Sequence, residues 1–146
     1  MSINIPETSQ KRAVIIGAGF AGLTLARKLA DDDFQVVLID KNNYHQFQPL
    51  FYQVTMSGLE PSSISFPLRK VFQGKKNVFI RVTTVTSVEP EKKELTTLLG
   101  TLAYDYLVIA IGADTNFFGN EELAKKALSM KSVSEALYLR LSLIHI

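Results

Sequence analysis

The sequence predicts an α/β fold: a doubly wound parallel sheet that carries a small antiparallel insertion. Three continuous apolar runs, at Ala13–Ile16, Val36–Ile39 and Tyr106–Ile111, are typical of strands buried on both faces of a parallel sheet. A segment with helical periodicity separates the first two runs. Short β-prone runs between turn residues precede the third run, and they predict the antiparallel insertion.

The composition is that of a globular domain and excludes several functions. The chain has 146 residues, of which 47% are hydrophobic and 21% charged, and this length predicts one domain. A net charge of +2 with scattered basic residues argues against nucleic-acid binding. With no cysteine and two histidines, the sequence predicts no disulfide, no redox-active thiol and no metal site. Any redox chemistry must therefore come from a cofactor.

Residues 1–12 are predicted to form a polar leader. They include Pro6, Glu7 and several other polar residues where a secretory signal would need an apolar run, so we expect a cytoplasmic location. No later stretch approaches the ~20 consecutive apolar residues of a membrane-spanning helix.

Periodicity predicts the elements that follow the leader. After the first strand, apolar residues recur at helical spacing, namely Leu23, Leu25, Ala26, Leu29 and Ala30. Asp31–Asp33 make the turn into the second strand, which ends at Asp40. The segment is therefore predicted to be a βαβ unit.

The middle of the chain is less regular. Residues 41–58 show neither period and are predicted to be mostly loop, with a helical turn near Tyr52. Ser65 is predicted to cap a helix that ends at Gly74, and a further strand is expected at Val78–Val82.

The insertion is expected at about residues 83–103. Its β-prone runs are Thr83–Val88, Glu94–Leu98 and Thr101–Ala103, and turn residues separate them. This spacing predicts a small antiparallel meander.

Two helices are predicted near the C-terminus, at Glu121–Leu128 and Val133–Leu141. Ser132 and Glu135 have the spacing of a capping box, which favours a helix start at this point. Residues 141–146 depart from the expected pattern and contain no terminating glycine or proline, so they are treated as an atypical tail.

A glycine-rich motif joins the first strand to the first helix. It is the GxGxxG run of Gly17, Ala18, Gly19, Phe20, Ala21 and Gly22, and Asp40 ends the next strand about 20 residues later. In this pattern Gly17 allows a tight turn, Gly19 lets a pyrophosphate approach, and Gly22 lets the helix pack on the strand. Helix amides would face the phosphates, and Asp40 would bind ribose hydroxyls. The sequence therefore predicts a Rossmann-like dinucleotide site; the alternative is a purely structural glycine turn.

The motif alone does not distinguish FAD from NAD, because both contain the groups that it binds. The insertion and the run Leu107–Ala113 resemble the two-dinucleotide flavoprotein family, in which a strand of this kind lies beside FAD. The resemblance implies that Ala110 and Gly112 lie near FAD and that the backbone of Val82 meets its adenine. Lys41, next to Asp40, is a candidate for contact with a ribose or phosphate. The alternatives are an ordinary turn at Gly112 and an exposed lysine at position 41.

The segment after the second strand carries the most specific resemblance. It resembles type II NADH dehydrogenases, the non-electrogenic NADH:quinone oxidoreductases, at Asn43, His45, Phe47, Pro49, Leu50, Tyr52, Gln53 and Val54. In that family the segment wraps the flavin end of FAD, which implies that Gln48 and Gln53 neighbour the ring or ribityl chain. Without the family, the aromatic residues here would be assigned to the core or to a lid, and His45 would be a surface or packed histidine. The resemblance covers Arg12 to about Arg140, so residues 13–140 are predicted to be an FAD-binding domain.

The resemblance implies an oxidoreductase that passes electrons from NADH through FAD to a quinone of the respiratory chain. Such an enzyme needs a second dinucleotide fold, and this chain has one fingerprint, so we expect an N-terminal piece that is inactive alone. The intact enzyme would be peripheral at the cytoplasmic face of the cell membrane, attached through a C-terminal part. A homodimer is left open, and no residue of this chain is assigned a catalytic role.

Two alternatives stay open. One is the FAD domain of another reductase of the same superfamily, such as a sulfide:quinone or rubredoxin reductase relative. The other is a nucleotide-binding module without catalysis. Flavin absorbance would favour the flavoprotein, whereas NAD binding without flavin would favour the module.

Overall fold

The computed structural model describes residues 3–145, which form two compact units. The first unit contains the residues up to His45 together with Pro67–Gly112. The second contains Gln46–Phe66 together with the residues from Ala113 onward. The chain therefore leaves the first unit after His45 and returns to it before completing the parallel sheet.

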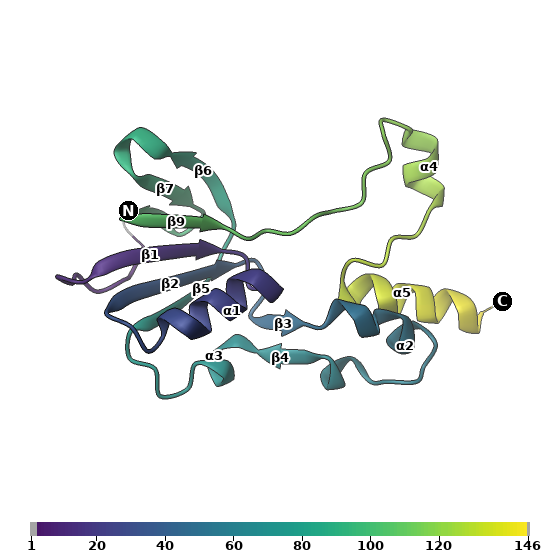
Figure 1. Ribbon diagram of the computed structural model, residues 1–146. Helices are drawn as coiled ribbons and strands as arrows, with labels where there is room; N and C mark the ends of the chain where they lie inside the picture. Colours follow the sequence, from purple (N-terminus) through teal and green to yellow (C-terminus); the bar gives the residue numbers. More distant parts are fainter. Residues whose placement is uncertain (1–2, 146) are drawn as a thin grey trace. The chain divides into compact units, whose positions relative to one another are not determined.

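The first unit is built on a four-stranded parallel sheet with the strand order β5-β2-β1-β9 (Figure 1). Its strands are β1 (Lys11–Ile16), β2 (Phe34–Asp40), β5 (Val78–Val82) and β9 (Tyr106–Ile109). All of the pairings between them are parallel. The predicted α/β class with a doubly wound parallel sheet is confirmed.

Strand β9 differs from the prediction in length and burial. It ends at Ile109 instead of Ile111, and it lies at the edge of the sheet. Tyr106 and Ile109 are exposed, so the elements that cover the two faces of the sheet leave these side chains uncovered. The prediction of a strand buried on both faces is therefore wrong for this run, although its parallel direction is right.

Each face of the parallel sheet has its own hydrophobic core, because successive residues of a strand point to opposite faces. On one face, Ile15 of β1 and Leu38 of β2 are buried beneath two helices. These helices are α1 (Phe20–Leu29) and α3 (Leu68–Val71). On the other face, the neighbouring residues Val14 and Val37 are buried in a separate core.

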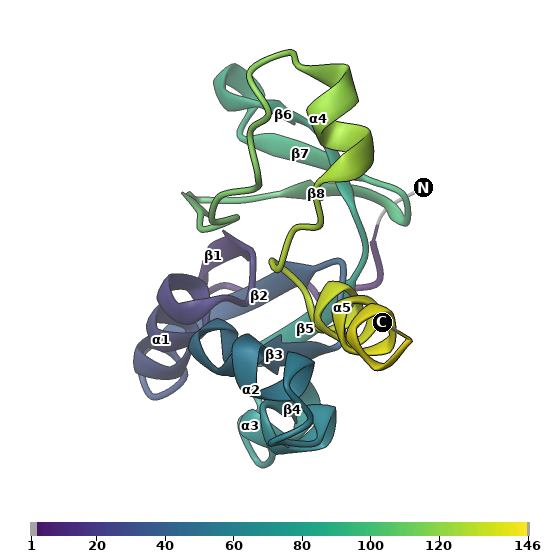
Figure 2. The same cartoon turned by 90° about the vertical axis from the view of Figure 1, so that its right-hand side faces the viewer.

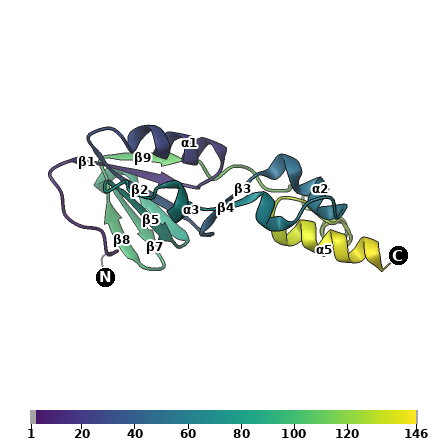
Figure 3. The same cartoon turned by 90° about the horizontal axis from the view of Figure 1, so that it is seen from below.

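The antiparallel insertion supplies the cover for this second face. It is a three-stranded sheet of β6 (Val85–Glu89), β7 (Glu94–Thr97) and β8 (Gly100–Ala103), in that order. Leu95 and Leu102 of the insertion pack into the core that contains Val14 and Val37. Figures 2 and 3 show α1 and the insertion on opposite sides of the parallel sheet. The predicted meander is confirmed.

The segment after β2 is more ordered than predicted. Residues 41–58 contain strand β3 (Tyr44–Gln46), a 3-10 turn at Gln48–Leu50 and helix α2 (Phe51–Thr55). The helical turn expected near Tyr52 is therefore confirmed as α2, but the expectation of mostly loop overlooked β3. β3 forms a two-stranded sheet with β4 (Ser65–Pro67), and this pairing joins residues about 20 apart in the sequence.

The predicted helix cap at Ser65 is wrong. Ser65 lies in β4, and α3 begins three residues later at Leu68, with Pro67 as its N-cap. The chain stays extended through Ser65 because β4 pairs with β3, and the Leu68 N–H donates to the carbonyl of Asn43 at 2.9 Å. Strand pairing thus delays the start of the helix.

The second unit is built around helices α2 and α5 (Val133–Ile144). The hydroxyl of Thr55 donates to the carbonyl of Phe51 in its own helix, at 3.1 Å, and lies 3.4 Å from that of Ala136 in α5. The predicted helix start is confirmed, since the Glu135 N–H donates to Oγ of Ser132 at 3.2 Å. The Glu135 carboxylate accepts the backbone N–H of Lys131 at 2.7 Å, one residue before the cap position.

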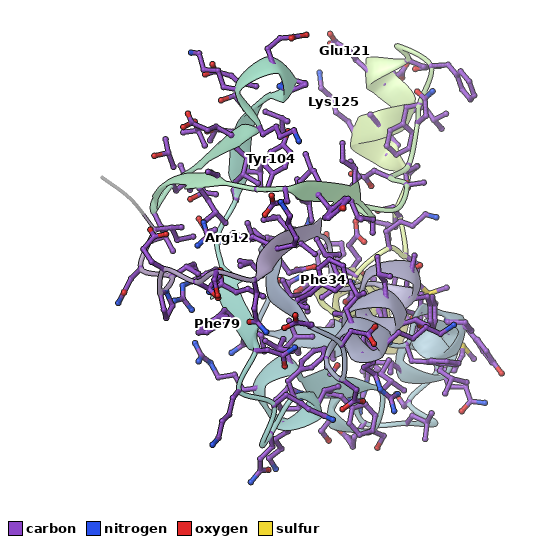
Figure 4. All side chains as sticks on the ribbon, turned by 60° about the vertical axis from the view of Figure 1, so that its left-hand side comes forward. Arg12, Phe34, Phe79, Tyr104, Glu121 and Lys125 are labelled. Carbon is purple, nitrogen blue, oxygen red and sulfur yellow. The ribbon has the colours of Figure 1, made fainter. Side chains whose placement is uncertain are left out.

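The remaining helix of this unit is α4 (Glu121–Lys126), which ends two residues earlier than predicted. Asn120 caps it by accepting a hydrogen bond from the Leu123 N–H at 2.9 Å. Glu121 and Lys125 lie one turn apart on its surface (Figure 4), with Lys125 Nζ 3.9 Å from Glu121 Oε2.

Helix α5 continues through Leu141 to Ile144, so most of the segment singled out as an atypical tail is helical, with Leu141, Leu143 and Ile144 exposed. Residue 146 lies outside the described residues. No helix within residues 3–145 combines the length and the apolar character needed to cross a bilayer.

Candidate dinucleotide-binding site

The glycine-rich motif forms a sharp corner between β1 and α1. β1 ends at Ile16, and the Gly17 N–H donates to the carbonyl of Ile39 in β2 at 2.7 Å. Gly17 has φ +101°, a conformation that residues with a side chain rarely adopt. Helix α1 then starts at Phe20, with Gly19 as its N-cap.

Two of the three motif glycines are required by close packing. A Cβ on Gly17 would overlap the carbonyl of Ala110, whose carbon would be only 2.8 Å away. A Cβ on Gly22 would overlap the carbonyl oxygen of Gly17 and would lie 3.2 Å from Cγ2 of Ile15. The start of α1 can therefore lie directly on the corner only because position 22 has no side chain.

Gly19 has the opposite environment. A Cβ placed there would meet nothing within 4 Å, so the space beside this residue is open. No side chain caps α1, and its first turn contains no acidic residue. Uncapped amides at a helix N-terminus carry about half a positive charge and favour an anion. The corner is thus open and electropositive at the position where a diphosphate is expected.

The carboxylate of Asp40 lies at this corner. Its Oδ2 accepts a hydrogen bond from the Ala18 N–H at 2.6 Å, and its Oδ1 accepts one from the Asn42 N–H at 2.8 Å. A carboxylate has about four lone-pair sites, so each oxygen can accept a further hydrogen bond. Asp40 is half-buried. It can therefore hold the turn and still accept hydrogen bonds from ribose hydroxyls.

The ends of β5 and β2 bring Val82 and Asp40 side by side. The two residues are register partners in the parallel pair, and the Thr83 N–H donates to the Asp40 carbonyl at 2.9 Å. Val82 is 40% exposed at this strand end. Lys41 follows Asp40 and is exposed. These residues lie at the carboxyl end of the sheet, which is where ligands bind in open α/β folds.

The carboxyl end of β9 lies on the other side of the corner. The Ala110 N–H donates to the carbonyl of Ile16 at 2.8 Å, which extends the pairing of β9 with β1 beyond Ile109. The Ala110 carbonyl faces the position where Gly17 lacks a Cβ. Gly112 follows two residues later, with φ +73°, a backbone conformation that favours glycine.

Gln48 and Gln53 belong to the second unit, whereas the corner belongs to the first. Gln48 is exposed in the 3-10 turn. Gln53 is half-buried in α2, and its side-chain amide donates to the hydroxyl of Tyr52 at 3.0 Å. The structure therefore gathers the candidates of the first unit around one corner, whereas these two glutamines belong to the second unit and are described within it alone.

His45 is a site residue to which the sequence analysis gave no role. Its Nδ1 lies 2.9 Å from the carbonyl oxygen of Ala18, within the glycine-rich corner, and the residue is 9% exposed. A single histidine in an irregular segment has no periodicity from which its position in the fold could be predicted. Its match to the type II NADH dehydrogenase pattern was the one feature of the sequence that singled it out.

The parallel sheet, the glycine corner and the acid at the end of β2 together define a Rossmann-like dinucleotide-binding fold. The chain belongs to the pyridine nucleotide-disulphide oxidoreductase family, whose sequence profile matches residues 11–144.

Individual relatives are similar to this chain over a limited part of their length. The type II NADH:quinone oxidoreductase Ndh of Mycobacterium tuberculosis is 39% identical over 133 residues, which cover 88% of this chain and 29% of that relative. The structure of NDH2 from Plasmodium falciparum in complex with NADH has a TM-score of 0.82 at 29% identity, covering 90% of this chain and 28% of that one. The sulfide:quinone oxidoreductase of Aquifex aeolicus has a TM-score of 0.81 at 30% identity, covering 92% of this chain and 32% of that one.

Proposed function

We propose that this chain is the FAD-binding part of an oxidoreductase that passes electrons from NADH through FAD to a quinone. The observation that carries the proposal is the corner itself: an open, uncapped helix start at Gly19 with the Asp40 carboxylate hydrogen-bonded to the preceding residue. A diphosphate fits the first feature and an adjacent ribose fits the second.

Each candidate residue has an expected role toward FAD. The Gly17–Gly22 corner would hold the diphosphate, Asp40 the adenosine ribose, and the backbone at Val82 the adenine. Lys41 would contact the ribose or a phosphate. Further contacts are assigned to Ala110 and Gly112 along the cofactor and to Gln48 and Gln53 at the flavin end.

When bound, FAD would supply an isoalloxazine ring that accepts two electrons from a nicotinamide and gives them to an acceptor. The chain's own residues would bind and orient the cofactor. No acid or base in the described residues is assigned to proton transfer.

NADH and quinone are proposed as the substrates of a longer protein. The name of the Mycobacterium tuberculosis relative contains both substrates, and the Plasmodium falciparum structure is a complex with NADH. This chain spans 29% and 28% of their lengths. We expect the chain itself to show no NADH:quinone turnover, because one dinucleotide fold cannot hold both FAD and NADH. Steady oxidation of NADH by this chain in the presence of a soluble quinone would contradict that expectation.

The test is a titration of the chain with FAD, FMN and NAD. Flavin absorbance and fluorescence report the binding of FAD and FMN, and calorimetry reports the binding of NAD. FMN contains the flavin but lacks the diphosphate and the adenosine, so the proposal expects FAD to bind at least about tenfold more tightly than FMN. Equal affinity for FAD and FMN would exclude recognition by this corner. Binding of NAD with no binding of FAD would favour a nucleotide module without flavin.

Similarity to the sulfide:quinone oxidoreductase of Aquifex aeolicus supports one alternative within the same superfamily. That alternative shares the FAD site but differs in the electron donor. NADH-dependent and sulfide-dependent quinone reduction by the longer protein would distinguish the two.

A further inference from the structure

We propose that His45 is a positioning residue for the glycine-rich corner: it orients the Ala18–Gly19 peptide so that the Gly19 N–H faces the diphosphate. This inference rests on the proposed FAD site and adds a residue to it. It depends on the contact between His45 Nδ1 and the Ala18 carbonyl, 2.9 Å apart.

The chemistry of this contact fixes the state of the ring. A backbone carbonyl can only accept a hydrogen bond, so Nδ1 of His45 must carry a proton and donate it. The ring is buried and packs edge-to-face against Phe20, with the ring centroids 5.4 Å apart. Packing and the hydrogen bond therefore hold the imidazole in one orientation.

The hydrogen bond from His45 fixes the orientation of the Ala18–Gly19 peptide. Without it, this peptide could rotate, because the glycine backbone is weakly restricted. A trans peptide is planar, and its C=O and N–H point in opposite directions. Because His45 holds the Ala18 carbonyl on one side, the N–H of Gly19 must point to the other side. Gly19 is the residue beside which a Cβ would meet nothing within 4 Å.

Asp40 holds the peptide on the other side of Ala18. Its Oδ2 accepts the Ala18 N–H at 2.6 Å, so both polar groups of the Ala18 backbone are bound by side chains. Ala18 stands between two glycines, whose backbone freedom is large. His45 and Asp40 together therefore give this corner one conformation before a ligand binds, and preorganisation of this kind increases affinity.

The test compares two substitutions that separate hydrogen bonding from packing. His45→Phe keeps a ring against Phe20 and removes the donor, whereas His45→Asn places an amide N–H near the position of Nδ1 and removes the ring. We expect His45→Phe to raise the Kd for FAD about tenfold, because the Ala18 carbonyl loses its partner. His45→Asn should stay within about threefold of the unsubstituted chain.

His145 provides the matched control. Its Nδ1 also lies close to a backbone carbonyl, that of Leu141 at 2.7 Å, but on an exposed part of the second unit. His145→Phe should leave the Kd for FAD unchanged. Equal affinities for His45→Phe and His145→Phe would overturn the positioning role, as would equal weakening by His45→Phe and His45→Asn.

A second measurement uses the unsubstituted chain and does not depend on folding of a variant. The ¹⁵N resonances of the His45 ring should show a proton on Nδ1 in the neutral imidazole, and a proton on Nε2 alone would overturn the inference. Failure of the unsubstituted chain to bind FAD would instead refute the proposed function, and with it the diphosphate role of His45. Tight FAD binding that is insensitive to His45→Phe would refute the inference alone.

Discussion

The carbonyl oxygen of Gly17 occupies the space that a Cβ atom on Gly22 would need. The two residues are the first and last glycines of the motif. The two ends of the motif are therefore in contact where α1 packs on the corner. Gly19, between them, has no neighbour in the direction of a Cβ within 4 Å. The same residue type therefore serves two purposes here: close packing at the ends of the motif and open access in its middle.

Substitution at the packed end should destabilise the fold. We predict that Gly22→Ala lowers the free energy of unfolding by about 1–3 kcal/mol, because the new methyl group would force the helix away from the Gly17 carbonyl. Urea unfolding followed by circular dichroism measures this change. An unchanged midpoint would mean that α1 does not lie on the corner as described.

Substitution in the middle should instead weaken ligand binding. Gly19→Ala has room for its methyl group, and φ at this position is −70°, so stability should change by less than about 1 kcal/mol. The methyl group would occupy the approach to the helix amides, and the Kd for FAD should rise by about tenfold or more. If Gly19→Ala bound FAD normally, the diphosphate would have to lie elsewhere.

The parts of the fold that the sequence predicted are those with local signals. A run of apolar residues, a glycine motif and a helical repeat specify β1, the corner and α1 within about 20 residues. The helix cap at Ser132 is equally local, because the hydrogen bond joins residues three apart. Each of these predictions depended on one short stretch of chain.

The features that the sequence did not reveal depend on distant pairing. Strand β3 has three residues, too few for alternation to be detected, and its partner β4 lies about 20 residues further along. Burial of β9 could not be judged either, because an apolar run does not show how much of each sheet face other elements cover. His45 acquires its role from a hydrogen bond to Ala18, 27 residues earlier.

Asp40 should contribute more to ligand affinity than to the fold. In Asp40→Asn the side-chain oxygen can still accept the Ala18 N–H, so the corner should persist, but the charge and one acceptor oxygen are lost. We predict that the Kd for FAD rises about tenfold or more, as expected for a hydrogen bond to a charged group. Asp32→Asn, in the exposed turn before β2, should leave the Kd unchanged. Equal affinities for the two variants would remove Asp40 from the proposed site.

The helix cap in the second unit can be tested separately. Ser132→Ala removes the oxygen that accepts the Glu135 N–H at 3.2 Å, and it should lower the free energy of unfolding by about 1 kcal/mol. Ser134→Ala, on an exposed position of the same helix, is the control and should have little effect. Urea titrations of both variants measure the difference. A larger effect at Ser134 would argue against a helix that starts at Val133.

Asp105 should make stability depend on pH in the acid range. The Arg12 backbone N–H donates to Asp105 Oδ2 at 2.8 Å and Lys11 Nζ donates to Oδ1 at 3.1 Å, and these contacts lower the pKa of Asp105 below its ordinary value of 3.8. Arg12 lies in β1 at the end far from the glycine corner, and Figure 4 shows its side chain.

A carboxyl group with a lowered pKa stabilises the folded state fully above its ordinary pKa, and the contribution is lost as the pH falls through the lowered value. We therefore predict that Asp105→Asn reduces stability at pH 7 and that the difference from the unsubstituted chain shrinks as the pH falls below 3.8. Melting temperatures measured between about pH 7 and pH 2.5 should differ less and less between the two proteins as the pH falls. A constant difference over that range would mean that the hydrogen bonds to Arg12 and Lys11 do not favour the charged form. FAD affinity at pH 7 should be unchanged, because Asp105 lies before the first residue of β9 and the glycine corner lies at the other end of the sheet.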